Sequence, residues 1–387
     1  MPLKKEEKFA WLPDASQTLS LQAALGNRET AGGAWQEIKD NALIEKLKTT
    51  SRGLFPLIYD NLQKHNLQDN AAMQFKIAHR ETFRDNLLMF RKAEQILRNL
   101  HEAGIGTLLL KGAALSSVYY RSSALRPMGD IDVLIKRADF QKAVHILREN
   151  KWQPDSENLP LYIEIYPSCS FIDAEGDELD LHWQIMRECW NTDNTDSLWD
   201  DAVEAKIGNT PVKVLSPAHQ LFHVCWHGVQ YNPTPPIRWI ADAVTILRKS
   251  NDELDWEKLV EIARLHRVNL MIFTALDYLD KNFAVEIPPE VLRRLKNSPL
   301  TGMQKTANIL QMSENPMPWT RRQYLRYYII KYLSLRSSTK LKPQSLVILK
   351  FLQYNLEVES FWQVPFSAFS KVFQLFILRR GSQYIKD

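Results

Sequence analysis

The stretch from Thr107 to Ile135 decides the fold, and it reads TLLLKGAALSSVYYRSSALRPMGDIDVLI. It opens with a short apolar run that ends at Lys111-Gly112, and a series of small residues follows. This pattern predicts a strand, a tight turn and a helix. At the other end of the stretch, residues 130–135 alternate acidic and aliphatic side chains, as a strand with one polar face does.

Further strands are expected downstream. A helix is predicted over 138–152, where apolar residues recur at helical spacing. Three strand-like pieces follow it, at Tyr162–Ile165, Ser170–Ile172 and Glu178–Trp183, and turn sequences such as DAEGD separate them. Residues 105–185 are therefore predicted to form a compact α/β unit with a small mixed sheet.

Helical sequence flanks this unit on both sides. Stretches within residues 1–104 carry apolar residues at three- and four-residue steps, and the last of them ends on Gly104, a frequent type of helix C-cap. Ser216-Pro217 favours the start of another helix, and amphipathic segments continue from there. The expected fold is α+β, with a helical region at 1–104, the core at 105–185 and a helical region at 186–387.

The amino-acid composition limits the class of protein to which the chain can belong. The chain has 387 residues, enough for two or three packed units, and its 45% hydrophobic and 24% charged residues are those of a soluble protein. The three cysteines lack the spacing of a zinc ribbon, the first residues lack an apolar signal segment, and no apolar run is long enough to span a membrane. These features predict a cytoplasmic protein.

Charge is distributed unevenly. Residues 320–387 hold twelve Lys or Arg and three acids, a local charge of +9, which leaves −5 on the remainder because the total is +4. The tail segment PFSAFSKVFQLFILRR is aromatic, apolar and basic, so it could contact a membrane surface or an acidic partner. The last helix of the fold is the simpler expectation. Nucleic acid is not an expected partner, since the core lacks a basic groove with aromatic residues.

The two acidic strands predict a metal site. Residues two apart in a strand point to the same face, so Asp130 and Asp132 project together, and Glu178, Asp180 and His182 repeat the arrangement. An isolated D-x-D is most often a solvated strand edge, but here Gly129 allows a tight turn into the strand and a second acidic strand follows. If the strands are neighbours, their carboxylates converge and require a cation. Oxygen ligands suit Mg²⁺ or Mn²⁺.

The turn Lys111-Gly112-Ala113 predicts a phosphate-binding element. It stands at a strand-to-helix junction, where the N–H groups of a helix N-terminus can hold a phosphate. Lys111 and Arg126 are cations that flank the acidic strand in sequence and could neutralise a triphosphate. Solvation at the surface is the alternative for both side chains.

Together these motifs resemble a known family. The runs LLLKGAALSSVYY, LRPMGDIDVLI and ELDLHW are similar to the signature of the DNA polymerase β-type nucleotidyltransferase superfamily, and in particular to its bacterial "uncharacterised nucleotidyltransferase" family. The similarity is closest over 105–185 and extends to HVCWHG and RWIADAVTIL. The resemblance implies Mg²⁺- or Mn²⁺-dependent chemistry on an NTP, with ATP the expected nucleotide.

The resemblance also implies roles for individual residues. Asp130 and Asp132 would be metal ligands that bridge to the nucleotide phosphates. Asp180 would be the third carboxylate, which contacts the catalytic metal and acts as a base or orients the acceptor. Gly112 would line the triphosphate. Ala113 departs from the superfamily, in which Ser or Gly is usual at this position, and the interval from Gly112 to Asp130 is longer than is common.

Histidines complete the expected site. His219, His223 and His227 recur every four residues along one helix face, but the absence of a supporting acid argues against a zinc site. His227 is expected to face the nucleotide or acceptor while the other two pack. His182 is expected to contact the nucleotide, with structural support of Asp180 as the alternative. The predicted nucleotide-binding residues are Lys111, Gly112, Ala113, Arg126, Gly129, His182 and His227.

The leading hypothesis is an enzyme that transfers a nucleoside monophosphate from an NTP to an unidentified acceptor and releases pyrophosphate. The acceptor is expected to be a small molecule, a sugar or a peptide. A non-catalytic module that binds a nucleotide is one alternative, and a toxin-type nucleotidyltransferase acting on tRNA or protein is another. The intact carboxylate set favours the enzyme, since a pseudoenzyme usually loses a metal ligand.

Overall fold

A computed structural model of the chain describes residues 9–155, 167–186, 196–208, 210–230 and 237–313, single positions at 159 and 163, and scattered positions between 349 and 370. The strand expected at Tyr162–Ile165 lies outside the described residues, except for Ile163. Most of the basic tail lies outside them as well.

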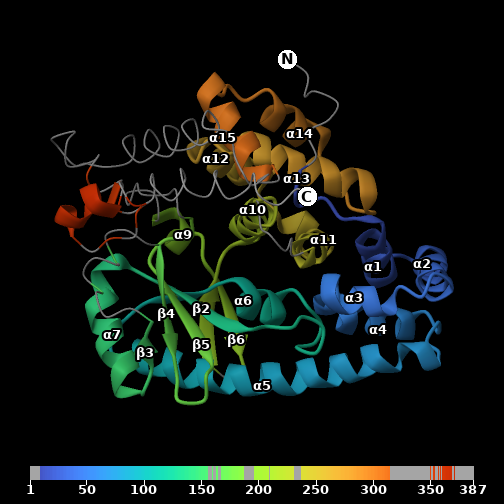
Figure 1. Ribbon diagram of the computed structural model, residues 1–387, viewed down its shortest axis with the longest axis horizontal. Coiled ribbons are helices and arrows are strands. Elements are labelled where there is room, and N and C mark those ends of the chain that lie inside the picture. The colour runs from blue at the N-terminus through green and yellow to red at the C-terminus, as the bar shows by residue number, and fades with distance from the viewer. Residues whose placement is uncertain are drawn as a thin grey trace, which may run out of the picture.

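A mixed sheet occupies the middle of the molecule (Figure 1). Across the described residues it has seven strands in the order β3-β4-β5-β2-β1-β7-β6. The central strand β2 pairs in parallel with β5 and antiparallel with β1, and β1 pairs in parallel with β7. The strands are β1 (Thr107–Leu109), β2 (Asp130–Ile135), β3 (Gln153–Pro154), β4 (Ser168–Ile172), β5 (Glu178–His182), β6 (Val203–Ile207) and β7 (Thr210–Val214).

The hairpin of β6 and β7 lies beyond residue 185, where only helix was expected. Its second strand alternates buried and exposed residues, and the buried Val212 and Val214 join the core beneath the sheet. This strand continues the sheet past β1, because an unpaired β1 would leave backbone groups without partners. The α+β class is confirmed with a sheet larger than predicted, while the domain boundaries stay a prediction.

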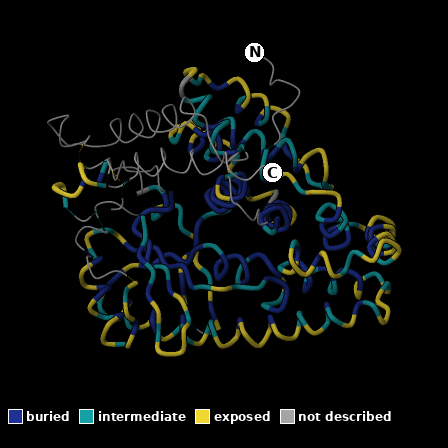
Figure 2. Tube along the Cα trace, viewed as in Figure 1, coloured by how far each residue is buried: buried dark blue, intermediate teal, exposed yellow. Residues whose placement is uncertain are grey.

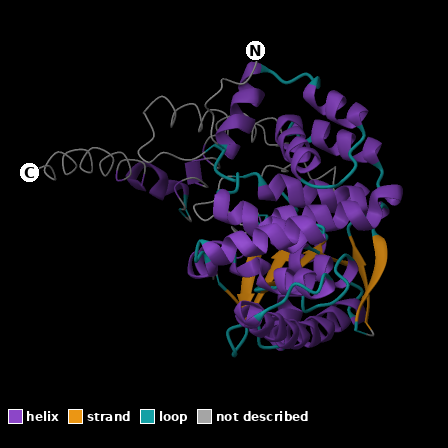
Figure 3. Cartoon of the chain, turned by 90° about the vertical axis from the view of Figure 1, so that its right-hand side faces the viewer, coloured by secondary structure: helices purple, strands orange, loops and turns teal. Residues whose placement is uncertain are grey.

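Helices cover both faces of the sheet (Figures 1 and 3). Those before the sheet are α1 (Ala15–Leu25), α2 (Arg28–Asp40), α3 (Ile44–Thr50), α4 (Phe55–Lys64) and α5 (Met73–Glu102). Those between strands are α6 (Lys111–Val118), α7 (Phe140–Glu149) and α9 (Asp196–Asp200). Those after it are α10 (Pro217–Gly228), α11 (Arg238–Ser250), α12 (Trp256–Leu265), α13 (Asn269–Asn282), α14 (Pro289–Lys296) and α15 (Gly302–Met312).

The alternation within β2 divides the interior into two cores. Ile131, Val133 and Ile135 point to one face and pack in the same cluster as residues of α5 and α7. Leu134 points to the other face and packs in the cluster that contains α10 and α11. Asp132 has the parity of Leu134, so the sequence pattern places its carboxylate on the side of α10.

Local signals explain two of the helix ends. Helix α5 ends at Glu102, and Gly104 follows with φ +75°, a left-handed conformation that suits glycine. Ser216 stands at the N-cap of α10 as predicted, but its side chain caps no backbone N–H and lies 2.9 Å from Nδ1 of His219. Within the described residues, no helix has both the length and the apolar character needed to cross a membrane.

Candidate active site

The sheet brings the two acidic strands together. Strands β2 and β5 are parallel neighbours, and in their register Asp132 lies opposite Asp180 while Asp130 lies opposite Glu178. The condition on which the predicted carboxylate cluster depended is therefore met. Since side chains opposite each other on neighbouring strands share a face, the carboxylates of Asp132 and Asp180 project to the same side.

Three side chains come close enough to share an ion. Possible ligand atoms of Asp132, Asp180 and His182, here called the carboxylate–histidine cluster, all lie within 4.8 Å of one another. Nε2 of His182 is 2.9 Å from Oδ1 of Asp132 and 3.9 Å from Oδ2 of Asp180. Asp130 is next along β2 and outside this group. The close third member is thus His182, which sequence reasoning had assigned to the nucleotide.

Asp132 is fully buried and is held in its ionised form. Its Oδ1 accepts hydrogen bonds from His182 and from Nζ of Lys111, the latter at 2.7 Å. Burial opposes ionisation, but the hydrogen bond from His182 and the positive charge of Lys111 outweigh it and lower the pKa of Asp132 well below its usual range. Its buried Oδ2 has no hydrogen-bond partner among the described residues. Such an oxygen suits a cation, since a buried anionic acceptor is costly when unpaired.

The other two carboxylates differ from Asp132 in their surroundings. Asp180 is half-buried, and its Oδ1 accepts a 2.5 Å hydrogen bond from the hydroxyl of Ser170, its cross-strand neighbour on β4. Sequence reasoning missed Ser170 because the pairing of β4 with β5 was unknown. For Asp130, burial and the charge of Asp132 raise the pKa. A cation bound nearby would relieve that repulsion.

The turn into α6 is strained and closely packed. Lys111 has φ +40°, an unfavourable conformation for a non-glycine residue, and its ammonium group points to Asp132. A Cβ on Gly112 would lie 2.6 Å from Nη1 of Arg126, so glycine is needed for this close approach. Ala113 is fully buried in the core beneath the sheet, so it offers no side chain to a ligand.

Arg126 is buried, so the alternative that it is solvated at the surface is wrong. Its guanidinium makes a bidentate ion pair with Asp242 of α11, with Nε 3.0 Å from Oδ1 and Nη2 3.1 Å from Oδ2. The hydroxyl of Tyr120 donates to the same carboxylate at 2.8 Å. These contacts fix the guanidinium over Gly112, beside the cluster. Asp242 therefore holds the guanidinium of Arg126 in place.

Gly129 does not need to be glycine for conformational reasons. Its φ lies outside the left-handed region, and no described atom lies within 4 Å of the position that a Cβ would take. The backbone conformation at this position therefore does not require a glycine, contrary to the tight turn that was expected. The glycine instead leaves open space directly before Asp130.

The histidines of α10 divide into two sets. His219 is buried next to Ser216, and Asp201 lies 3.9 Å from its ring. His223 is buried and His227 is accessible to solvent, and the charges of Lys111 and Asp132 act on both rings. Burial is the main cause of the lowered pKa of His223, which falls to about 3. His219 and His223 are buried, as expected of packing residues, and the role of His227 at the site stays a prediction.

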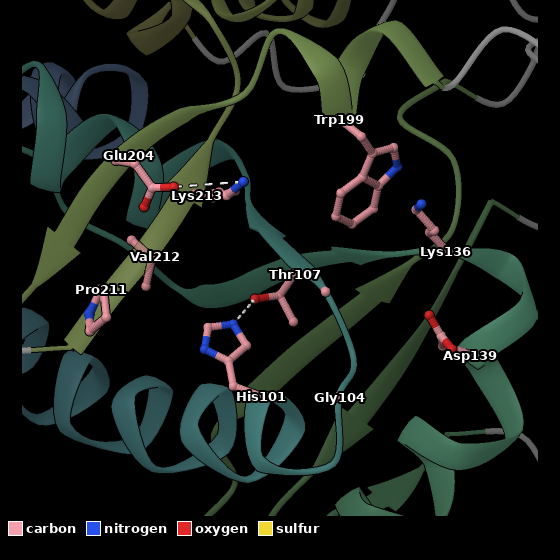
Figure 4. Close-up of a pocket in the computed structure, with 11 residues that line it drawn as sticks. His101, Gly104, Thr107, Lys136, Asp139, Trp199, Glu204, Pro211, Val212 and Lys213 are labelled. Atoms are coloured by element: carbon pink, nitrogen blue, oxygen red, sulfur yellow. Dashed lines mark hydrogen bonds and ion pairs between the residues drawn. The ribbon is translucent and has the colours of Figure 1, made fainter.

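A cavity of about 630 Å³ lies at the start of β1 and the end of β2, which are the strand ends away from the carboxylate–histidine cluster (Figure 4). Its polar side chains already interact with neighbours: Lys213 is 3.6 Å from Glu204, His101 is 2.8 Å from the hydroxyl of Thr107, and Lys136 lies over the ring of Trp199. Among the described residues, no group of possible metal ligands lines this cavity.

Comparison with known proteins identifies a family match. The model of the family described as "Uncharacterised nucleotidyltransferase" matches residues 48–284. The matched region begins well before the motifs at residue 105, so it includes α5 as well as the whole sheet and α10 to α12. No curated protein matches the chain.

Two solved structures have distant similarity. An antigenic nucleotidyltransferase-like protein from Paracoccidioides brasiliensis is 14% identical, with 55% of this chain and 93% of that chain covered and a TM-score of 0.34. The lincosamide antibiotic adenylyltransferase LnuA, bound to lincomycin, is 16% identical, with 40% and 94% covered and a TM-score of 0.30. Similarity at this level supports no conclusion about the site or its substrates.

Proposed function

Because the chain belongs to the uncharacterised nucleotidyltransferase family, we propose that it transfers a nucleoside monophosphate from an NTP, with ATP the first candidate, to an acceptor and releases pyrophosphate. The observation that carries the proposal is the carboxylate–histidine cluster beside Lys111, at the start of α6. The acceptor is a hydroxyl or amine of a small molecule, a sugar or a peptide.

The cluster is suited to Mg²⁺ or Mn²⁺. Asp132 offers a buried oxygen that has no partner in the described part of the chain, Asp180 faces it across the strand pair, and Asp130 is the next carboxylate along β2. When bound there, a divalent ion supplies charge neutralisation for the triphosphate and activation of the acceptor hydroxyl. His182 donates to Asp132 and so holds this carboxylate in place.

Lys111 and Asp180 have separate roles in the proposed transfer. Burial disfavours the charged form of Lys111, but the charge of Asp132 raises its pKa, so the ammonium group persists and can donate to a phosphate oxygen. Ser170 occupies one oxygen of Asp180, so the other oxygen is available to take the acceptor proton. The acceptor oxygen or nitrogen then bonds to the α-phosphorus, and the bond from that phosphorus to the bridging oxygen breaks to release pyrophosphate.

The test is incubation of the full chain with each α-labelled NTP, Mn²⁺ or Mg²⁺, and pools of hydroxyl compounds, sugars and peptides. We expect label transfer together with pyrophosphate release, and a loss of about 10²-fold or more in Asp132→Asn. The matched control is Glu204→Gln, an exposed strand carboxylate on β6 at the edge of the sheet, which should retain activity. Pyrophosphate release that is equal in wild type and Asp132→Asn would refute the assignment. NTP binding without any turnover would identify a binding module instead.

A further inference from the structure

A second arginine lies beside Arg126 at the site. Arg238 is the first residue of α11, and its Nη1 is 3.2 Å from the carbonyl oxygen of Pro127. Nη1 of Arg126 is 3.4 Å from the same oxygen. The two guanidinium groups, here called the arginine pair, therefore converge on the segment that leads into Gly129 and Asp130, although Pro127 and Arg238 are 111 residues apart in the chain.

The two arginines are neutralised unequally. Asp242 engages Arg126 with both oxygens, so the fork of that guanidinium is occupied. Arg238 donates a hydrogen bond to the carbonyl of Pro127, which is neutral. The arginine pair and Asp242 together carry a net charge of +1, and within the described residues Arg238 retains donors for an anion.

The surroundings of Arg238 disfavour its positive charge, and a bound anion would stabilise that charge. Burial and the positive charge of Arg126 lower the pKa of Arg238, while the charges of Asp242 and Asp130 raise it. The arginine pair lies near the acidic strand, because both guanidinium groups contact the carbonyl oxygen of Pro127, three residues before Asp130. A phosphate group bound near these charges would pair with the guanidinium of Arg238.

We propose that Arg238 binds the β- and γ-phosphates of the NTP, with Arg126 as the fixed partner that positions this arm of the site. This inference rests on the proposed function and adds a phosphate-binding residue from α11, on the C-terminal side of the fold. Lys111 approaches from the turn into α6 and Arg238 from α11, so the two cations come from different segments. The pyrophosphate that leaves in the transfer would remain paired with a guanidinium as its charge grows.

The test compares ligands that differ only in their phosphates. Binding of ATP, AMP and inorganic tripolyphosphate to the full chain is measured by calorimetry for wild type, Arg238→Met and Arg238→Lys. We expect Arg238→Met to weaken ATP and tripolyphosphate by about tenfold or more, and to change AMP less than twofold. Arg238→Lys should recover part of the loss, because it restores the charge without the fork.

Arg248→Met is the matched control. Arg248 lies on the same helix, and its Nη1 also donates to a backbone carbonyl, that of Leu25, away from the cluster. It should leave the binding of all three ligands unchanged, and thermal melting of each variant verifies folding. Equal affinity of wild type and Arg238→Met for ATP and tripolyphosphate would overturn this inference alone, as would an equal loss for ATP and AMP. Failure of the wild type to bind any NTP would overturn the proposed function with it.

Discussion

Gly112 and Arg126 show how closely single residues are fitted at the site. The guanidinium of Arg126 occupies the space that any side chain at position 112 would need, and Asp242 holds this guanidinium in place with two hydrogen bonds. Lys111, one residue earlier, accepts a left-handed backbone that brings its ammonium group to Asp132. Strain and close packing thus coincide at the turn to which phosphate binding is assigned.

Gly112→Ala should therefore destabilise the fold and weaken NTP binding. The added Cβ would force Arg126 off Asp242 or displace Met128, whose Cγ would lie 3.2 Å away, and we expect a cost of about 1–3 kcal/mol in unfolding free energy. Gly33→Ala on α2 is the control, because no described atom lies within 4 Å of its Cβ position, and it should stabilise by about 0.5–1 kcal/mol. Urea denaturation measures the unfolding free energy of both variants. Equal stability of Gly112→Ala and wild type would contradict the steric argument.

Helix α10 links the site to the helices above the sheet. Almost every residue along it is buried, and its histidines face different neighbours: His219 lies near Ser216 and Asp201, while His223 and His227 lie in the field of Lys111. Burial lowers the pKa of His219 to about 4, partly opposed by the charge of Asp201. The buried imidazole of His219 is therefore uncharged at neutral pH.

Acidification should destabilise the protein through His219. Its folded pKa of about 4 is below the unfolded value near 6.5, so between these limits the unfolded chain binds a proton that the folded chain excludes. Its contribution is fully present above about pH 6.5 and falls as the pH drops to 4, by about 3 kcal/mol at most. Urea denaturation at pH 7 and 4.5 should show a smaller loss in His219→Gln than in wild type. An identical loss in both would exclude this histidine as the cause.

The two cores on opposite faces of the sheet make the helical regions and the α/β unit interdependent (Figure 2). One core joins Trp35 and Phe75 of the N-terminal helices with Phe222 and Ile240 of α10 and α11. The other joins the sheet with α5 and α7. The proposed site therefore combines elements that are far apart in the sequence: the turn into α6, the strands β2 and β5, and the helices α10 and α11.

The fragment 105–185 should not fold alone, although its motifs define a recognisable unit. Without α5, only α7 would cover the apolar face formed by Ile131, Val133 and Ile135, and without β7 the edge of β1 would be unpaired. Circular dichroism and near-ultraviolet spectra of the fragment should be those of an unfolded or aggregated chain, whereas the full chain should unfold cooperatively. A fragment with native-like spectra and a cooperative transition would show that α5 and the β6–β7 hairpin are dispensable.

The periodicity of apolar residues was sufficient to predict an element where neighbouring residues in the sequence decide its structure. Strand β2 has the predicted bounds, 130–135, and α7 lies within the predicted helix, because each pattern depends on which side of a single element is apolar. The hairpin of β6 and β7 was not predicted. TPVKV is too short a segment for its alternation to be distinguished from a loop, and only pairing with β1 gives it a partner.

The sequence by itself determined that Asp130 and Asp132 share a face, that Asp180 and His182 repeat the pattern, and that a glycine turn follows β1, because the two-residue period of a strand is a local property. Only the tertiary structure decided which of these side chains meet. The register of β2 and β5 placed Asp132 opposite Asp180 and brought in His182. The pairing of Arg126 with Asp242, 116 residues away, and the approach of Arg238 depend on how α11 packs over the sheet. Such contacts follow from the burial of apolar surface by whole elements, which no short segment of sequence specifies.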